Sequence, residues 1–334
     1  MHASNGSLTT LIEAARYYDY RRASNPLDDG TRSPIPAVEW PADLHERGGT
    51  RIVPLDTSTE LGCAGPATTP GLLASFVHVR PGDAILTDAA ATSQLFFVMR
   101  GSGRSTLTGS GATLAGAAPA TIPWSAGDLF TLPADCRAMH SADDDAALYW
   151  VHDGPLLSYL GATPSRPLFP PTLYQRSRIH AELDAVASDP ASRHANRVSV
   201  LLGSQVFPST LTLTHVLWAM FGLLPVGAVQ AAHRHQSVAV DLVVDARPGC
   251  FTLVGESLDA SGEIVNPRRF DWRPQAVFLT PPGLWHSHHN ESGHPAHILP
   301  IQDAGLHTHL RTLDIRFSRR RADGTGEVVA AAAG

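Results

Sequence analysis

The chain carries matching landmarks in two halves, and this internal repeat restricts its fold more than any other feature. Three pairs of turn residues keep nearly one offset, of 145 or 148 positions: Gly82 with Gly227, Gly101 with Gly249, and Pro133 with Pro281. Self-similarity of this kind indicates that one unit of structure occurs twice. We therefore expect two domains of the same architecture in tandem.

Short apolar runs broken by glycine, proline and aspartate fill most of both halves. Such runs are typical of the strands of a sandwich or barrel, so we expect an all-β fold with minor helices. The stretches Leu8–Arg21 and Gln175–Ser188 favour helices, because apolar residues of the latter recur at helical spacing. The clearest predicted strands are Leu72–Val79, Gln94–Met99, Leu211–Leu217, Val238–Val244 and Ala276–Thr280.

The charge balance and the cysteines exclude several classes of protein. A formal net charge of -6 over 334 residues argues against a nucleic-acid partner, which requires a basic surface. The three cysteines form no CxxC pair and so favour a reducing compartment. Charged residues interrupt the N-terminal segment, so it lacks the apolar run of a signal peptide. No apolar stretch is long enough to span a bilayer. We expect a cytoplasmic protein with no membrane partner.

Histidine is the one unusual residue of the composition. The chain has 17 histidines, and seven of them lie between His286 and His309. His233 and His235 are separated by one residue, so on a strand both side chains project from the same face. A third imidazole from a later strand would complete three nitrogen ligands. The other side of the metal would stay open, as in catalytic rather than structural sites.

The second half carries these histidines and the first does not. Shifted by the repeat, positions 233, 235 and 286 fall on Asp88, Ala90 and Ala138. Asp88 and His140 cannot by themselves make a three-ligand site. We therefore expect the first half to be a structural and oligomerising partner, and the chain to form a homo-oligomer.

Two motifs carry a resemblance to a known family: Gly227-x5-His233-x-His235 and Pro281-x-Gly283-x2-His286-x3-Asn290. Together they resemble the two motifs of the cupin superfamily, and the repeated layout resembles the bicupins. The residue patterns His233-Arg234-His235 and Trp285-His286-x-His288 are similar to those of gentisate 1,2-dioxygenase and the relatives that cleave salicylate and hydroxynaphthoate. The resemblance implies two tandem cupin barrels, which are double-stranded β-helices of the jelly-roll type.

On this basis we divide the chain into five parts. They are an N-terminal helix and arm (1–50), an N-terminal cupin without the metal motif (51–160), a helical linker (161–198), a C-terminal metal-binding cupin (199–318) and a flexible tail (319–334). The tail contains the basic run Arg319–Arg321, which is typical of a solvated chain end.

The resemblance implies a ferrous iron bound by His233, His235 and His286. Imidazole binds several divalent ions, so the ligand type leaves manganese, zinc and nickel as alternatives. Two features depart from the gentisate branch. In that branch the metal sits in the first cupin, whereas here only the second can hold it. The branch also has a basic residue about where Asp241 stands.

His288 and Asp241 are the predicted catalytic residues. His288 lies two residues beyond His286 and should project to the same side. There it can act as an acid–base group, or it can hydrogen-bond to a metal ligand without touching the metal. Asp241 can reach the metal, orient a ligand histidine, bind an amino or hydroxyl group of the substrate, or lie at the surface. Four aromatic neighbours form either a wall for a planar ring or packed core: Trp218, Phe221, Phe251 and Trp285.

Three functions remain open for such a site. The first is an Fe(II)-dependent dioxygenase that uses O2 to cleave the ring of a hydroxylated aromatic acid of gentisate or salicylate type. The second is a non-oxidative metal-dependent enzyme, namely an isomerase, lyase or decarboxylase. The third is a bicupin that binds a small molecule without turning it over. The resemblance favours the first.

Overall fold

The computed structural model describes residues 12–23, 25, 32–113 and 120–330. The chain divides into two compact units, residues 1–34 and 35–334. In the first unit a short helix, α2 (Tyr20–Ala23), follows residues 15–19, which have no regular structure. Tyr17 and Tyr18 are exposed there, so no packed apolar face stabilises a helix. The predicted helix Leu8–Arg21 is therefore wrong over 15–19, and its residues 8–11 lie outside the described part.

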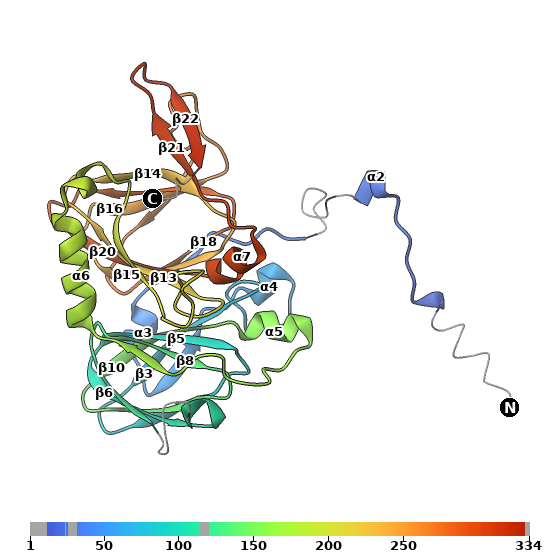
Figure 1. The fold of residues 1–334 in the computed structure, drawn as a ribbon, viewed down its shortest axis with the longest axis vertical. Helices are drawn as coiled ribbons and strands as arrows, with labels where there is room; N and C mark the ends of the chain where they lie inside the picture. Colours follow the sequence, from blue (N-terminus) through green and yellow to red (C-terminus); the bar gives the residue numbers. More distant parts are fainter. Residues whose placement is uncertain (1–11, 24, 26–31, 114–119, 331–334) are drawn as a thin grey trace. The chain divides into compact units, whose positions relative to one another are not determined.

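Ten antiparallel strands of the second unit form the first barrel (Figure 1). They are β2 (Arg51–Pro54), β3 (Leu73–Val79), β4 (Ala84–Thr87), β5 (Ser93–Arg100), β6 (Ser102–Thr108), β7 (Thr121–Ser125), β8 (Leu129–Pro133), β9 (Arg137–Ala142), β10 (Ala146–His152) and β11 (Thr172–Tyr174). One sheet has the order β11-β8-β5-β10-β3-β2, and the sheet opposite it has the order β4-β9-β6-β7.

Twelve strands form the second barrel in the same way. They are β1 (Glu39–Trp40), β12 (Val198–Leu202), β13 (Trp218–Leu224), β14 (Val229–Arg234), β15 (Ala239–Asp245), β16 (Cys250–Gly255), β17 (Arg268–Asp271), β18 (Val277–Thr280), β19 (Trp285–Asn290), β20 (Ala296–Gln302), β21 (Arg316–Arg320) and β22 (Gly326–Ala330). The two sheets have the orders β1-β18-β15-β20-β13-β12 and β17-β16-β19-β14-β21-β22.

The two barrels share one buried apolar cluster. It joins residues of the first barrel, such as Phe76 and Tyr149, to residues of the second, such as Val240 and Leu242. The Tyr149 hydroxyl donates a hydrogen bond to the Val240 carbonyl across this boundary at 3.5 Å. Burial of this continuous apolar surface holds the six-stranded sheet that contains β3 against the six-stranded sheet that contains β15.

Short helices connect and cover the barrels. They are α3 (Asp43–Glu46), α4 (Ser58–Leu61), α5 (Gly154–Leu160), α6 (Arg176–Ser188) and α7 (Ala304–Leu310), with 3-10 turns η1 (Ser110–Thr113) and η2 (Pro190–His194). The predicted helix Gln175–Ser188 is confirmed as α6, which buries Ile179 and Leu183 in the shared cluster. In the described part of the chain, no helix is both long and apolar enough to cross a membrane.

Four of the five predicted strands are confirmed, as β3, β5, β15 and β18. The prediction for Leu211–Leu217 is wrong, because this stretch is a loop that ends where β13 begins. The Thr214 hydroxyl accepts hydrogen bonds from the backbone N–H groups of Val216 and Leu217, at 3.2 and 2.8 Å. Local side-chain hydrogen bonds of this kind compete with a strand ladder, even where the apolar residues are buried.

A C-terminal hairpin extends the sheet that contains β14. Its strand β21 pairs with β14, with Phe317 opposite His233, and with β22 on its other side. Residues 319–330, which we expected in a flexible tail, thus lie in this hairpin or its turn (Figure 1). The pairing joins residues far apart in the sequence, so no local pattern reveals it.

Candidate metal centre

Two neighbouring strands bring the histidines together. β14 and β19 pair with His233 opposite His286, and the centroids of the two rings lie 4.0 Å apart. Donor nitrogens of His233, His286 and His288 lie within 4.8 Å of one another, the one such group among the described residues. A register irregularity between Gln230 and His233 interrupts β14 here, as bulges beside functional sites do. This group can hold a metal ion.

His235, the third predicted ligand, follows the end of β14 and lies beside this group. Its ring centroid is 5.0 Å from that of His286 and 6.3 Å from that of His233. All four histidines are buried, with at most 4% of each exposed. The structure therefore places all four predicted histidines near one another, but the group whose nitrogens lie within 4.8 Å contains His288 and not the predicted ligand His235.

Hydrogen bonds to backbone carbonyls fix the protons of three of these rings. The Nδ1 atoms of His233, His235 and His286 lie 3.1, 2.8 and 3.2 Å from the carbonyl oxygens of residues 231, 237 and 284. A carbonyl oxygen only accepts, so each Nδ1 carries the proton and each Nε2 keeps a lone pair. A lone pair on Nε2 is what a divalent ion requires.

His288 has a different neighbour. Its Nδ1 lies 2.8 Å from the Thr252 hydroxyl, a group that can donate as well as accept. The His288 ring is therefore not held by a backbone carbonyl in the Nδ1–H tautomer, the form in which the other three rings can bind a metal through Nε2.

Burial keeps the four rings neutral. It lowers the pKa of His235 to about 4 and the pKa values of His233, His286 and His288 well below their usual range. Mutual repulsion among the imidazoles and with Arg197 lowers these values further. Neutral imidazole is the form that binds metal, so the site is ready for an ion without losing protons first.

Arg197, which sequence reasoning missed, places a cation beside the histidines. It precedes β12, and one guanidinium nitrogen donates to His233 Nε2 at 3.0 Å while another contacts the Met220 sulfur at 2.5 Å. Burial lowers the pKa of Arg197 to about 10, so it remains charged at neutral pH. With its amide turned to accept, Gln230 takes a hydrogen bond from Arg197 at 3.2 Å.

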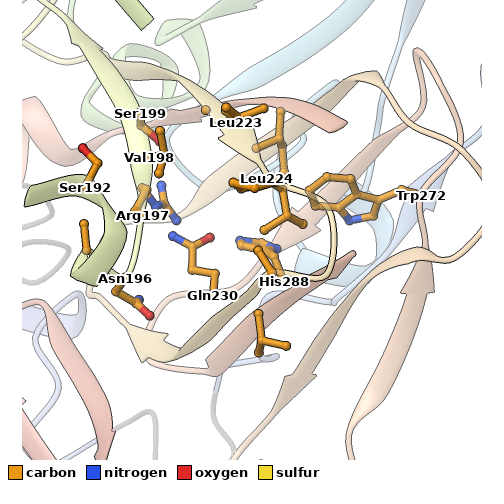
Figure 2. Close-up of a pocket in the computed structure, with 16 residues that line it drawn as sticks. Ser192, Asn196, Arg197, Val198, Ser199, Leu223, Leu224, Gln230, Trp272 and His288 are labelled. Carbon is orange, nitrogen blue, oxygen red and sulfur yellow. The ribbon is translucent and has the colours of Figure 1, made fainter. Parts of the chain in front are cut away.

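Two cavities meet at Arg197. The larger, of 1090 Å³, is lined by His233, His235 and Arg197, with Trp218 and Phe317 among its apolar residues. The smaller, of 330 Å³, is lined by Arg197, Gln230, Trp272 and His288. Figure 2 shows Arg197, Gln230 and His288 pointing toward one another in this smaller cavity. The cluster of imidazoles thus has open space on two sides.

Asp241 faces the inside of the second barrel. Its neighbours Val240 and Leu242 belong to the cluster between the barrels, so the alternation of β15 turns Asp241 the other way. Its carboxylate accepts a hydrogen bond from the Thr280 hydroxyl at 2.8 Å. Burial raises the pKa of Asp241 to about 7, against the opposing effects of Thr280 and Arg197. It lines neither cavity.

Of the four predicted aromatic neighbours, only Trp218 lines the larger cavity. Phe221 belongs to the shared cluster between the barrels. Phe251 stacks on His289 with ring centroids 4.6 Å apart, and Trp285 lines neither cavity. The cavity wall that sequence reasoning missed is Phe317, whose ring lies 5.8 Å from that of His233.

In the first barrel the corresponding positions are closed. Thr87 stands opposite Ala138 as His233 stands opposite His286, so the counterpart of His233 is Thr87 rather than the predicted Asp88. His140 occupies the place of His288, and the Thr87 hydroxyl lies 2.8 Å from its Nε2. This half has one histidine where the second half has three.

Solved structures with the same fold include dioxygenases. Salicylate 1,2-dioxygenase from Pseudaminobacter salicylatoxidans matches with a TM-score of 0.66 at 16% identity, over 94% of this chain and 97% of that one. A tryptophan-to-tyrosine variant of that enzyme in complex with gentisate gives a TM-score of 0.67 at 14% identity, over 93% and 94% of the two chains. The fold is a bicupin. Both barrels are covered, which confirms the predicted architecture.

One curated protein shares part of the sequence. The 1-hydroxy-2-naphthoate 1,2-dioxygenase of Nocardioides sp. (strain KP7) is 28% identical over 159 residues, which are 47% of this chain and 38% of that protein. The match therefore spans well under half of the relative's length. No family model matches the chain. The partial sequence match and the match in fold both lead to proteins named as dioxygenases.

Proposed function

We propose that this bicupin is a metal-dependent dioxygenase that cleaves the ring of an aromatic acid with a hydroxyl group next to its carboxyl group. The observation that carries the proposal is a set of three imidazoles whose Nε2 atoms carry the lone pair, beside a cavity that is also lined by a half-buried guanidinium. Salicylate, gentisate and 1-hydroxy-2-naphthoate, the compounds in the names of the similar proteins, all have this pair of groups.

We assign the metal to His233, His235 and His286. All three donate Nδ1–H to a carbonyl, so their Nε2 atoms can bind a metal. His288 Nδ1 faces the Thr252 hydroxyl instead, which does not fix the tautomer in this way. With three neutral imidazoles as its protein ligands, a divalent ion would keep its double charge and could attract the oxygens of an anionic substrate. We propose Fe(II), because an ion that changes oxidation state gives electrons of the ring a route to O2.

Arg197 is the proposed partner of the substrate carboxylate. It is a half-buried cation that lines both cavities, and a guanidinium matches a carboxylate with two parallel hydrogen bonds. Trp218 and Phe317 line the same cavity and offer apolar surface to a planar ring. A cavity of 1090 Å³ has room for a one-ring or two-ring acid.

In the proposed reaction the bond between the two substituted ring carbons breaks, and each of them takes one atom of O2. The hydroxyl-bearing carbon becomes a carboxylate and the other becomes a ketone next to the original carboxylate. The ring supplies the electrons, so no other reductant is needed. Arg197 holds the carboxylate throughout. Asp241 stays a predicted contributor, a buried acid held by Thr280 to which we assign no substrate contact.

Metal content and oxygen uptake test this proposal together. The metal-free protein is loaded in turn with Fe²⁺, Mn²⁺ and Zn²⁺ and offered salicylate, gentisate and 1-hydroxy-2-naphthoate. We expect O2 consumption and loss of the aromatic absorbance with Fe²⁺, and neither in His286→Ala. His140→Ala, which removes the histidine that corresponds to His288 in the first barrel, should keep both. Turnover with Zn²⁺ in the absence of O2 would instead support a non-oxidative lyase or decarboxylase.

A further inference from the structure

A hydrogen-bonded chain behind His288 has a copy in the first barrel. In the second barrel the Trp272 indole N–H donates to the Thr252 hydroxyl at 2.8 Å, and this hydroxyl lies 2.8 Å from His288 Nδ1. In the first barrel Trp124 donates to Ser105 at 2.9 Å, which lies 2.7 Å from His140 Nδ1. Each of the six residues is at most 4% exposed.

In the first barrel, the hydrogen bonds of this chain can run in only one donor-to-acceptor direction if every donor is to have an acceptor. Its indole N–H can only donate, and at the other end the Thr87 hydroxyl donates to the Ala138 carbonyl at 3.4 Å. Thr87 therefore accepts from His140 Nε2–H, and Ser105 donates to Nδ1. The reverse direction would leave the buried Ser105 hydroxyl proton without an acceptor, which costs stability.

The same rule applies to His288. Thr252 makes no other side-chain hydrogen bond with the described residues, so His288 Nδ1 is the acceptor available to its hydroxyl proton. Nδ1 then has no proton and Nε2 carries it. Among the described residues no hydroxyl receives this Nε2–H, because the position of Thr87 in the first barrel is occupied by His233 in the second. The ring instead lines the smaller cavity beside Gln230 and Arg197.

We infer that Thr252 and Trp272 are positioning residues that hold His288 as an Nε2–H donor facing the cavity. His288 then donates a hydrogen bond to an oxygen of the bound aromatic acid and is not a metal ligand, although its nitrogens lie near those of His233 and His286. The role toward the substrate rests on the proposed function, whereas the position of the ring proton does not.

Long-range ¹H–¹⁵N correlation NMR of the histidine-labelled, Zn²⁺-loaded protein tests the inference. Protonated, unprotonated and metal-bound ring nitrogens resonate in separate regions. We expect a protonated Nε2 and an unprotonated Nδ1 at His288, and the same pattern at His140. Thr252→Val should change the His288 signals alone, and Thr252→Ser should preserve them. Ser105→Ala is the matched control, which should change only His140.

Binding measurements on the same variants test the role. Thr252→Val should bind salicylate about tenfold more weakly at unchanged metal affinity, as expected for one misplaced hydrogen bond. A metal-bound Nε2 at His288, or loss of metal from Thr252→Val or His288→Ala, would overturn the inference. The NMR result on the unmutated protein decides the tautomer even if a variant does not fold. A protonated Nε2 in a protein without oxygenase activity would refute the proposed function and leave the tautomer standing.

Discussion

Replacing Arg197 with methionine should strengthen metal binding and weaken substrate binding. Arg197 donates to His233 Nε2 at 3.0 Å, and this is the lone pair that a metal would use. A metal ion must therefore displace the guanidinium from that nitrogen. Once displaced, the cation is free to meet the carboxylate of a substrate in the same cavity. Methionine has similar length and takes part in neither interaction.

The two effects have similar size and opposite sign. A hydrogen bond from a charged donor contributes about 1.5–3 kcal/mol. Its loss should raise the affinity for a divalent ion by about 10- to 100-fold, because each 1.4 kcal/mol is a factor of ten. Loss of the guanidinium–carboxylate pair should lower salicylate affinity by about the same factor. Arg197→Lys keeps the charge but not the two-pronged geometry, so its salicylate affinity should fall between the two.

Competition with a chelator measures the metal affinity, and calorimetry on the Zn²⁺-loaded protein measures salicylate binding. Salicylamide, which has no carboxylate, is the matched ligand: it should bind the methionine variant and the parent protein almost equally. Arg176→Met, on the groove between the barrels, is the control variant and should change neither affinity. Weaker metal binding in Arg197→Met, or an undiminished preference for salicylate over salicylamide, would refute the reasoning.

Three further outcomes follow from the site. Burial raises the pKa of Asp241 from its usual 3.8 to about 7, so the metal-free protein should lose stability relative to Asp241→Asn as the pH rises from 4 through 7, by at most about 4 kcal/mol; urea unfolding at pH 5 and pH 8 measures this, and parallel curves would contradict it. Phe317→Ala should weaken salicylate binding about three- to tenfold by calorimetry, because an aromatic contact contributes roughly 0.5–1.5 kcal/mol; an unchanged affinity would exclude the hairpin from the site. Chelation should lower the melting temperature, since an ion at 100 times its Kd adds about 2.7 kcal/mol; His140→Ala should keep this shift and His286→Ala should abolish it.

The repeat predicted the fold because its landmarks are conformationally restricted. Gly82 and Gly227 have φ values of +79° and +71°, and Gly101 and Gly249 have values of +81° and +105°. Residues with a side chain rarely adopt this region, so a glycine is required at the same turn of each copy. Pairing between distant segments leaves no such mark, which is why the pairing of β21 with β14 was not predicted. The loop at Leu211–Leu217 was missed for another reason, because the hydrogen bonds that the Thr214 hydroxyl accepts from the backbone are not visible in a pattern of apolar residues.

The site was predictable as far as it depends on strand alternation. His286 and His288 lie on one strand, and the structure brings both into the same group, as a period of two requires. His233 and His235 follow the rule less closely, because β14 has an irregularity before His233 and ends at Arg234. The ligand set stays a prediction. Arg197 had no signal in the sequence, since it is one of 25 basic residues and reaches the site from the segment before β12.

Strand register shows which aromatic side chains of the first barrel have no aromatic counterpart in the second. Phe96 pairs with Phe130 and Trp150, and these rings stack with centroids 4.8 and 5.6 Å apart. In the second barrel Asp241 stands in the place of Phe96, since it pairs with Phe278 and Pro300.

Two of the three aromatic side chains are thus replaced by a carboxylate and a proline. Phe96 and Trp150 therefore have no aromatic counterpart in the second barrel, whose histidines and Arg197 line two cavities. A metal site in the first barrel would therefore need more than new histidines at positions 87 and 138. It would also need Phe96 and Trp150 to be replaced by smaller residues, because a close-packed interior does not accept added volume.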